Sequence, residues 1–150
     1  MNHHVWTDEQ LAKAPIFRGL SKRQLRTVCG LAARIDVQPG KVLAKEGEPG
    51  SEFFIILDGK VDVRHGDHVL ATRGPGEFVG EMALIDCQPR TADLVATTPA
   101  VIEVMSRREF QTLLTEVPAV WNHLRATTAA RRAGLAYTPD ESHAEGGRSG

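Results

Sequence analysis

The chain has 150 residues, which suits a single domain and leaves no room for two full hydrophobic cores. Lys and Arg number 18 against 19 Asp and Glu, and the resulting net charge of −1 disfavours general binding to nucleic-acid backbones. Hydrophobic residues make up 41%, too many for a wholly disordered chain. No apolar run approaches the roughly 18 residues that cross a bilayer, and the first seven residues are too polar for a signal peptide. We therefore expect a cytoplasmic globular domain without a membrane segment.

The first part of the chain, from about Thr7 to Ala33, has a helical pattern. Ser21 is suited to cap a helix, and Leu25, Val28 and Leu31 follow it at near-helical spacing. This pattern predicts helix before residue 33.

From residue 34 to 106 the pattern changes to short apolar runs separated by glycines. Residues 60–64 alternate polar and apolar, which is typical of a strand with one buried face. Residues 53–57 are apolar throughout, so we expect that strand to be buried more deeply. Many short strands without intervening helices favour an antiparallel sandwich or jelly roll over a parallel sheet.

Helical spacing returns after residue 107. Phe110 and Leu113 mark one apolar face, and Pro118 predicts an elbow before a second helix that runs to about Gly134. Residues 138–150 carry no large apolar side chain, so we expect a disordered polar tail. The predicted organisation is one domain over residues 1–137, with its core at about 16–134.

The segment from Gly76 to Ala92 carries the most chemistry. Gly80 lets the backbone approach a ligand closely, and a short helix beginning at Glu81 would point the N–H groups of Met82 and Ala83 at an anion. Arg90 adds a charge-assisted bond to the same anion. These features predict a phosphate site.

Two further side chains extend this site towards a sugar. The hydroxyl of Thr91 follows the arginine and is placed to join it at the phosphate. A carboxylate repels phosphate unless it faces another group, and Glu81 is suited to accept a hydrogen bond from a sugar hydroxyl. Phosphate and ribose together indicate a nucleotide.

The same residues resemble a known family. The pattern Phe78-x-Gly80-Glu81-x-Ala83-Leu84, followed by Pro89-Arg90-Thr91-Ala92, is similar to the phosphate-binding cassette of the cyclic-nucleotide-binding domain family. The resemblance covers roughly residues 16–134. It implies a mainly β fold, an eight-stranded antiparallel jelly roll with N-terminal and C-terminal helices, that binds 3′,5′-cyclic AMP or cyclic GMP.

The resemblance also implies roles for single residues. It places the ribose 2′-hydroxyl on Glu81 and the cyclic phosphate on Arg90 with the backbone of residues 80–83, and it puts Thr91 and Ala92 beside the phosphate and base. The base would be walled by Val61, Val63 and Leu70, although alternation alone equally describes these three as core residues. Because the hydroxyl of Thr91 could also reach the amino group of guanine, the base stays open between adenine and guanine.

The end of the chain departs from the family. A lid over the base would have to be Leu135, Ala136 or Tyr137, because the last helix stops near Gly134. That helix lacks a sustained apolar seam, which favours a monomer or weak homodimer. The 18 residues after Arg132 are too few for a DNA-binding module, so none is expected. A basic patch or a solvated helix face describes equally well the cationic residues Arg125, Arg131 and Arg132, together with Lys22, Arg23 and Arg26.

Competing interpretations remain open from the sequence. Glu81 and Arg90 alone could form an ordinary surface salt bridge, and domains of this fold can serve as ligand-free interaction modules. Four histidines, at positions 3, 4, 65 and 68, lack the density of a metal-dependent jelly-roll enzyme, so no metal is expected. We find no nucleophile–base pair and no P-loop, so we expect no enzyme and no cofactor.

The leading hypothesis is a cyclic-nucleotide receptor. It would signal to an unknown protein effector through the helices of residues 107–134, with motion centred on Pro118.

Overall fold

The computed structural model describes residues 12, 14–81, 84 and 89–133. A 3₁₀ turn, η2 (Pro15–Phe17), and a helix, α2 (Lys22–Leu31), precede the strands. The strands are β1 (Ala33–Val37), β2 (Val42–Ala44), β3 (Glu52–Asp58), β4 (Val61–His65), β5 (His68–Arg73), β6 (Phe78–Val79), β7 (Asp93–Ala96) and β8 (Ala100–Ser106). Helices α4 (Arg107–Glu116) and α5 (Pro118–Arg132) follow them.

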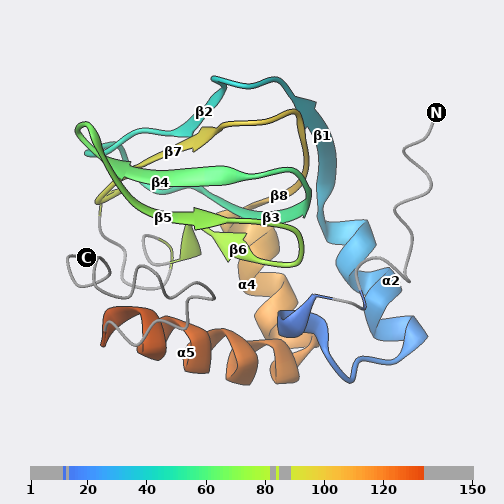
Figure 1. Ribbon diagram of the computed structural model, residues 1–150. Coiled ribbons are helices and arrows are strands. Elements are labelled where there is room, and N and C mark those ends of the chain that lie inside the picture. The colour runs from blue at the N-terminus through green and yellow to red at the C-terminus, as the bar shows by residue number, and fades with distance from the viewer. Residues whose placement is uncertain (1–11, 13, 82–83, 85–88, 134–150) are drawn as a thin grey trace.

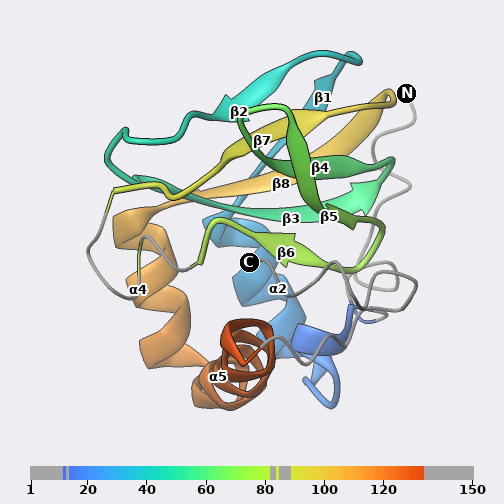
Figure 2. The same cartoon turned by 60° about the vertical axis from the view of Figure 1, so that its left-hand side comes forward.

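The eight strands form a sandwich of two antiparallel sheets (Figures 1 and 2). One sheet has the order β1-β8-β3-β6 and the other the order β2-β7-β4-β5. All pairings between neighbouring strands are antiparallel. The mainly β jelly-roll fold with flanking helices that the sequence predicts is therefore confirmed.

Strand β3 lies at the centre of the molecule because both of its faces are covered. Phe53, Ile55 and Leu57 pack into a cluster with the helices, whereas Phe54 and Ile56 pack into the core between the sheets. Because both faces of this strand are buried, its side chains are apolar on both faces, and the sequence is a continuous apolar run and not an alternating one. The expectation that this strand is buried more deeply than its neighbour is confirmed.

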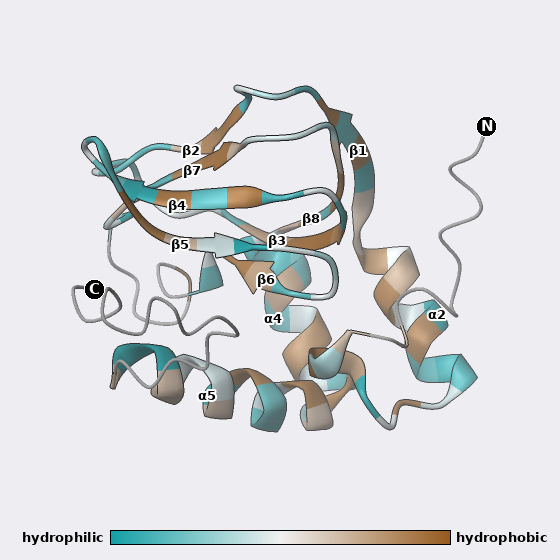
Figure 3. Cartoon of the chain, viewed as in Figure 1, coloured by the Kyte–Doolittle hydropathy of each residue, from teal (hydrophilic) through white to brown (hydrophobic). Residues whose placement is uncertain are grey.

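The helices cover the sheet that contains β3. Helix α4 packs against both α2 and α5, and α5 also contacts η2. In Figure 1, α5 runs beneath the strands, and Figure 3 shows its C-terminal end as hydrophilic. The C-terminal part of α5 therefore lies close to strand β6.

Capping residues fix where two of the helices begin. Ser21 accepts a hydrogen bond from the backbone N–H of Gln24, and the Gln24 side chain accepts one from the N–H of Ser21. Ser106 and Glu109 form the same reciprocal pair at the start of α4. Each cap satisfies backbone donors that the helix itself leaves open. The prediction of Ser21 as a helix cap is confirmed.

The predicted N-terminal helical segment is slightly too long at its end. Helix α2 ends at Leu31, and strand β1 already begins at Ala33, where its pairing with Val104 starts.

Pro118 is the first residue of α5, a position in which the missing proline N–H costs no hydrogen bond. The predicted boundary between the two last helices is therefore confirmed.

Some expectations lie outside the described residues, namely the start of the predicted helical pattern at residues 7–11, the tail at 138–150 and the end of the last helix at Gly134. Across the part of the chain that the structure describes, no helix is long and apolar enough to span a membrane.

Gly59 in the turn between β3 and β4 supplies a test of the packing. Its φ is +91°, and a Cβ there would lie 2.6 Å from the Cβ of Ala100. We expect Gly59→Ala to combine a left-handed backbone penalty of about 1–2 kcal/mol with overpacking of about 1–3 kcal/mol. Urea unfolding measures the sum.

Gly40 is the matched control, because its φ is +93° and a Cβ at this position would meet no atom within 4 Å. Gly40→Ala should therefore cost only the backbone penalty. Equal losses in the two variants would contradict the close approach at Gly59.

Candidate functional site

Gly80, directly after strand β6, sits where a side chain would not fit. Its φ is +90°, and a Cβ would lie 2.8 Å from Nη1 of Arg90 and 3.1 Å from the carbonyl oxygen of Glu52. Both the left-handed backbone and this crowding require glycine. The residue thus allows the arginine to lie against the backbone.

The Arg90 side chain is held by backbone carbonyl groups. Its Nη1 donates to the carbonyl oxygen of Gly80 (3.0 Å), and its Nη2 donates to that of Glu52 (2.7 Å). The guanidinium carbon lies 5.8 Å from the centre of the Phe54 ring. The residue is only 7% exposed. Contacts within the chain alone therefore fix the orientation of the guanidinium.

The electrostatics of Arg90 follow from this burial. Desolvation lowers the pKa of its guanidinium, the carboxylates of Glu52 and Glu81 raise it, and the nearby cation of Arg107 lowers it. An arginine keeps its proton near neutral pH despite such a shift. Bringing an anion to this position would compensate the buried charge.

The backbone on either side of Arg90 is also paired. Its N–H donates to the carbonyl oxygen of Glu48, and its carbonyl oxygen accepts from the N–H of Gly47, both at 2.8 Å. Pro89 forms an isolated bridge with Pro49. The arginine is thus anchored to the loop before β3 as well as to Gly80.

Glu81 is buried at 2% exposure, and its partners come from α5. Its carboxylate accepts from Nη1 of Arg131 at 3.3 Å and from the hydroxyl of Thr128 at 3.5 Å. A buried carboxylate is costly unless it is paired and hydrogen-bonded, and these two residues supply both. The last helix is therefore bonded to the predicted ribose-binding residue.

Arg131 makes two further contacts with the same segment. Its Nη2 donates to the carbonyl oxygen of Phe78 (3.0 Å), and its guanidinium carbon lies 4.4 Å from the centre of the Phe78 ring. Stacking of this kind adds a cation–π attraction to the ion pair. Arg131 thus contacts the carboxylate of Glu81 and both the carbonyl group and the ring of Phe78.

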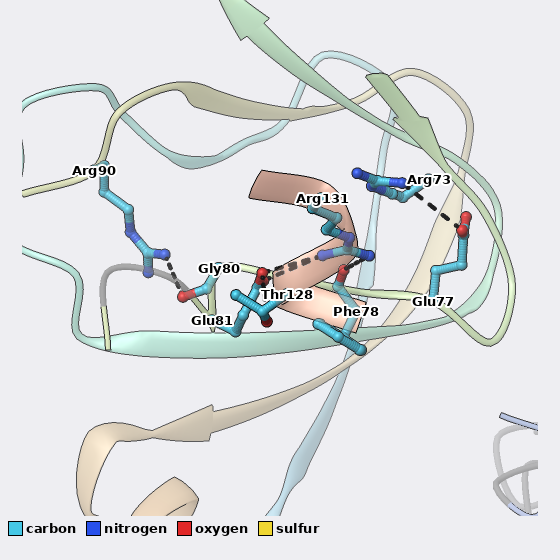
Figure 4. Close-up of polar contacts among 8 residues, drawn as sticks. All are labelled: Arg73, Glu77, Phe78, Gly80, Glu81, Arg90, Thr128 and Arg131. Atoms are coloured by element: carbon cyan, nitrogen blue, oxygen red, sulfur yellow. Dashed lines mark hydrogen bonds and ion pairs between the residues drawn. The ribbon is translucent and has the colours of Figure 1, made fainter. Parts of the chain in front are cut away.

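Figure 4 shows the order of these groups in space. Arg90 approaches Gly80 from one side, and Arg131 reaches Glu81 and Phe78 from the other. Because Glu81 and Arg90 are both buried and bond to different partners, the interpretation as a surface salt bridge between them is wrong. They are two separate polar groups on either side of one glycine.

The other predicted binding residues are placed as follows. Ala92 is buried and Thr91 is exposed, and both follow Arg90 directly before β7. Met82, Ala83 and Tyr137 lie outside the described residues, as do the alternative lid positions 135 and 136. The anion-binding role of the N–H groups at 82 and 83 therefore stays a prediction.

The three residues expected to wall the base differ in burial. Val61 is fully buried in the core between the sheets, whereas Val63 and Leu70 are partly exposed. Leu70 lies at the register shift between β4 and β5. Val63 also packs against that core, so the core interpretation describes both Val61 and Val63. A contact with a ligand stays a prediction for all three residues.

Sequence reasoning missed the two residues of α5 that reach Glu81. The interpretation of Arg131 as part of a basic patch or a solvated helix face is wrong, because its side chain is only 12% exposed. The signal was present in the spacing, since Val120, Leu124, Thr128 and Arg131 fall on one helical stripe. The apolar stripe becomes polar at the point where it passes Glu81.

Among the residues that the structure describes, no group of three or more His, Cys, Asp or Glu is placed to hold a metal ion. His65 instead lies 3.2 Å from the carboxylate of Glu46 at the exposed end of the β4–β5 hairpin.

Comparison with known sequences places the chain in a family. Residues 34–117, more than half of the chain, match the cyclic nucleotide-binding domain. The chain therefore belongs to the cyclic nucleotide-binding domain family, as its cassette motif predicts.

Three similar proteins illustrate the range of the family. The Pycsar effector protein XpPycTIR of Xanthomonas perforans is 38% identical over 100 residues, covering 66% of this chain and 33% of that protein. A cyclic nucleotide-gated potassium channel of Rhizobium etli is 36% identical over 125 residues, covering 83% and 35%. The regulatory subunit of a cAMP-independent protein kinase A from Trypanosoma brucei has a solved structure with a TM-score of 0.75 and 27% identity, covering 84% and 45%. The chain spans about a third of the length of the first two of these relatives.

The contact between α5 and Glu81 makes a testable contribution to stability. Arg131→Met leaves a buried carboxylate without its cation, so we expect a loss of about 3–5 kcal/mol in unfolding free energy by urea titration. Arg125→Met, an exposed arginine on the same helix, should stay within about 0.5 kcal/mol of the wild type.

A double variant separates the ion pair from general packing. Adding Glu81→Gln to Arg131→Met should recover part of the loss, because no buried charge then stays uncompensated. Additive losses would show that the two side chains do not depend on one another.

Proposed function

We propose that this member of the cyclic nucleotide-binding domain family is a non-catalytic receptor for a 3′,5′-cyclic nucleotide that signals through α5 to a protein effector. The observation that carries the proposal is that Glu81 lies beside the phosphate-type site at Arg90 and is bonded to α5. One carboxylate thus connects the predicted ligand contacts to the element that can report on them.

The phosphate end of the ligand is supported by Arg90. Its guanidinium is buried, is held by two carbonyl oxygens and stands where the backbone at Gly80 permits close approach. A cyclic phosphodiester carries one negative charge, and a hydrogen bond to a charged group contributes about 1.5–3 kcal/mol. Partial burial strengthens such a bond relative to a surface contact.

The ribose end is supported by Glu81. A carboxylate accepts hydrogen bonds only, so it suits a sugar hydroxyl and not a phosphate oxygen. The same oxygens accept from Arg131 and Thr128, so a bound ribose would share or displace these donors. Ligand binding and the position of α5 are thereby coupled through one group.

The outward signal would pass through the two C-terminal helices. Helix α5 begins at Pro118, directly after α4, and its far end carries Thr128 and Arg131. A ligand that changes the bonds of Glu81 acts on the end of α5 that is remote from the proline. Such a switch needs a ligand with different affinities for two positions of the helix. The effector would be a protein surface that contacts one of these positions better.

A second candidate function is an interaction module that binds no nucleotide. The favouring observation is that the Glu81 carboxylate already has an ion-pair partner and a hydroxyl donor within the chain. The two functions differ in whether any cyclic nucleotide changes the stability of the domain.

Reversing the charge of Arg90 tests the phosphate contact. We expect cAMP or cGMP to raise the melting temperature of the wild type, since ligand at about 100 times its Kd adds roughly 2.7 kcal/mol. Arg90→Glu should abolish the shift by placing a carboxylate against the phosphate, and Glu81→Ala should weaken it. Calorimetric titration gives the affinities.

The matched control is Arg108→Glu, which makes the same change in net charge at an exposed position of α4. It should retain the wild-type affinity. Equal binding by the wild type and Arg90→Glu would contradict the site, and no response of the wild type to any cyclic nucleotide would favour the interaction module.

The coupling to α5 is tested by hydrogen exchange. Saturating nucleotide should change amide exchange both at residues 76–92 and in α5 of the wild type. In Arg131→Met the change should persist at residues 76–92 and fade in α5, because the bond between the two is gone. A wild-type change in exchange that is confined to residues 76–92 would contradict the proposed signalling through α5, but it would still support nucleotide binding.

A further inference from the structure

Arg73, at the end of β5, faces the interior of the sandwich. The register pairs Arg73 with Val61 and Ala71 with Val63. Directly opposite residues share a face of the sheet, and Val61 is part of the core between the two sheets. An arginine therefore stands on the same inward face as the apolar residues of β4, in a row where alternation predicts an apolar side chain.

The outward face of the same two strands has its own arginine. Arg64 pairs with Asp62, and Asp62 also accepts a hydrogen bond from the hydroxyl of Thr72. These polar residues alternate with the inward row. Arg64 and Arg73 are thus two arginines of one hairpin that face opposite sides.

The position of Arg73 is supported by the turn that follows it. Its Nη1 lies 4.0 Å from Oε2 of Glu77, while Oε1 of Glu77 accepts from the N–H of Gly74 at 2.7 Å. The side chain of Arg73 is only 12% exposed. The ion pair with Glu77 orients a guanidinium group, which carries five N–H donors in a planar fork.

The groups of the site follow one another in a definite order. Figure 4 shows Arg90 at one end, then Gly80 and Glu81, and Arg73 with Glu77 at the other end. Arg131 contacts Phe78, the neighbour of Glu77, and so lies between the two ends. A nucleotide with its phosphate at Arg90 and its ribose at Glu81 has its base left to extend towards Arg73.

We infer that Arg73 selects the base of the cyclic nucleotide, favouring bases with a carbonyl group at the reading edge over bases with an amino group there. The inference rests on the proposed function, because it assigns the third part of the same ligand. A guanidinium only donates hydrogen bonds. Guanine offers O6 and N7 as acceptors and uracil offers O4, whereas adenine and cytosine present an amino donor at the same place.

Pairs of nucleotides that differ at one position isolate this contact. Cyclic IMP differs from cyclic AMP by a carbonyl in place of the amino group at position 6, and cyclic UMP differs from cyclic CMP in the same way at position 4. Cyclic IMP also lacks the 2-amino group of guanine, so any contribution from the Thr91 hydroxyl is removed. A well-placed arginine–base contact corresponds to about tenfold in affinity.

The experiment is calorimetric titration of the intact chain with the cyclic nucleotides of guanine, hypoxanthine, adenine, uracil and cytosine. We expect the wild type to bind cIMP and cGMP about tenfold more tightly than cAMP, and cUMP more tightly than cCMP. Arg73→Gln carries an amide that both donates and accepts, so both ratios should fall towards one. Arg64→Gln, on the outward face, should retain the wild-type ratios.

The outcomes distinguish this inference from the function on which it rests. Binding of cAMP by the wild type that equals or exceeds binding of cIMP, or ratios that survive in Arg73→Gln, would overturn the role of Arg73 alone. Failure of the wild type to bind any of the five nucleotides would overturn the receptor itself, and the base selection with it. If Arg73→Gln does not fold, as judged by thermal unfolding, Arg73→Lys takes its place in the titrations. Lysine keeps the charge but loses the planar fork, so both affinity ratios should again fall towards one, and wild-type ratios in this variant would overturn the role of Arg73.

Discussion

The buried carboxylate of Glu81 is the group on which the arrangement of the site depends. A charge with 2% exposure is tolerable only with strong partners, and here they come from a helix some fifty positions further along the chain. The ion pair and hydrogen bonds that satisfy this one charge therefore hold the end of α5 against Glu81. The stripe of α5 that begins with Val120 and Leu124 supplies the apolar part of the same contact.

Arg90 is held by a different principle. Two backbone carbonyl oxygens and the ring of Phe54 fix its guanidinium, while the nearest carboxylates act on it only through space. Neutral carbonyl groups orient an arginine without cancelling its charge, so the positive charge of Arg90 is available to the anion that we propose binds there. The glycine between Arg90 and Glu81 is the structural condition for both, since a Cβ at Gly80 would collide with the arginine.

Much of the cassette could be predicted because its chemistry is local. Gly80, Glu81 and Arg90 lie within eleven positions, and their spacing alone indicates a phosphate beside a sugar. The family match over residues 34–117 agrees with that motif. The partners of Glu81 could not be found in the same way. Helical spacing puts Arg131 on the stripe of Val120 and Leu124 and leaves the exposed Arg125 off it, but only helix packing shows that this stripe reaches Glu81.

The sequence by itself determined the class of fold, the depth of β3, the start of α2 and the elbow at Pro118, because each follows from local periodicity, capping or proline geometry. The tertiary structure alone decided which arginines face inward. Arg73 is inward because β5 pairs with β4 in a register that places it opposite Val61, and Arg131 is inward because α5 passes close enough to β6 to bond with Phe78. Both depend on contacts between residues far apart in the chain. Local spacing places Arg131 on the apolar stripe of α5, but it does not say which strand that stripe meets.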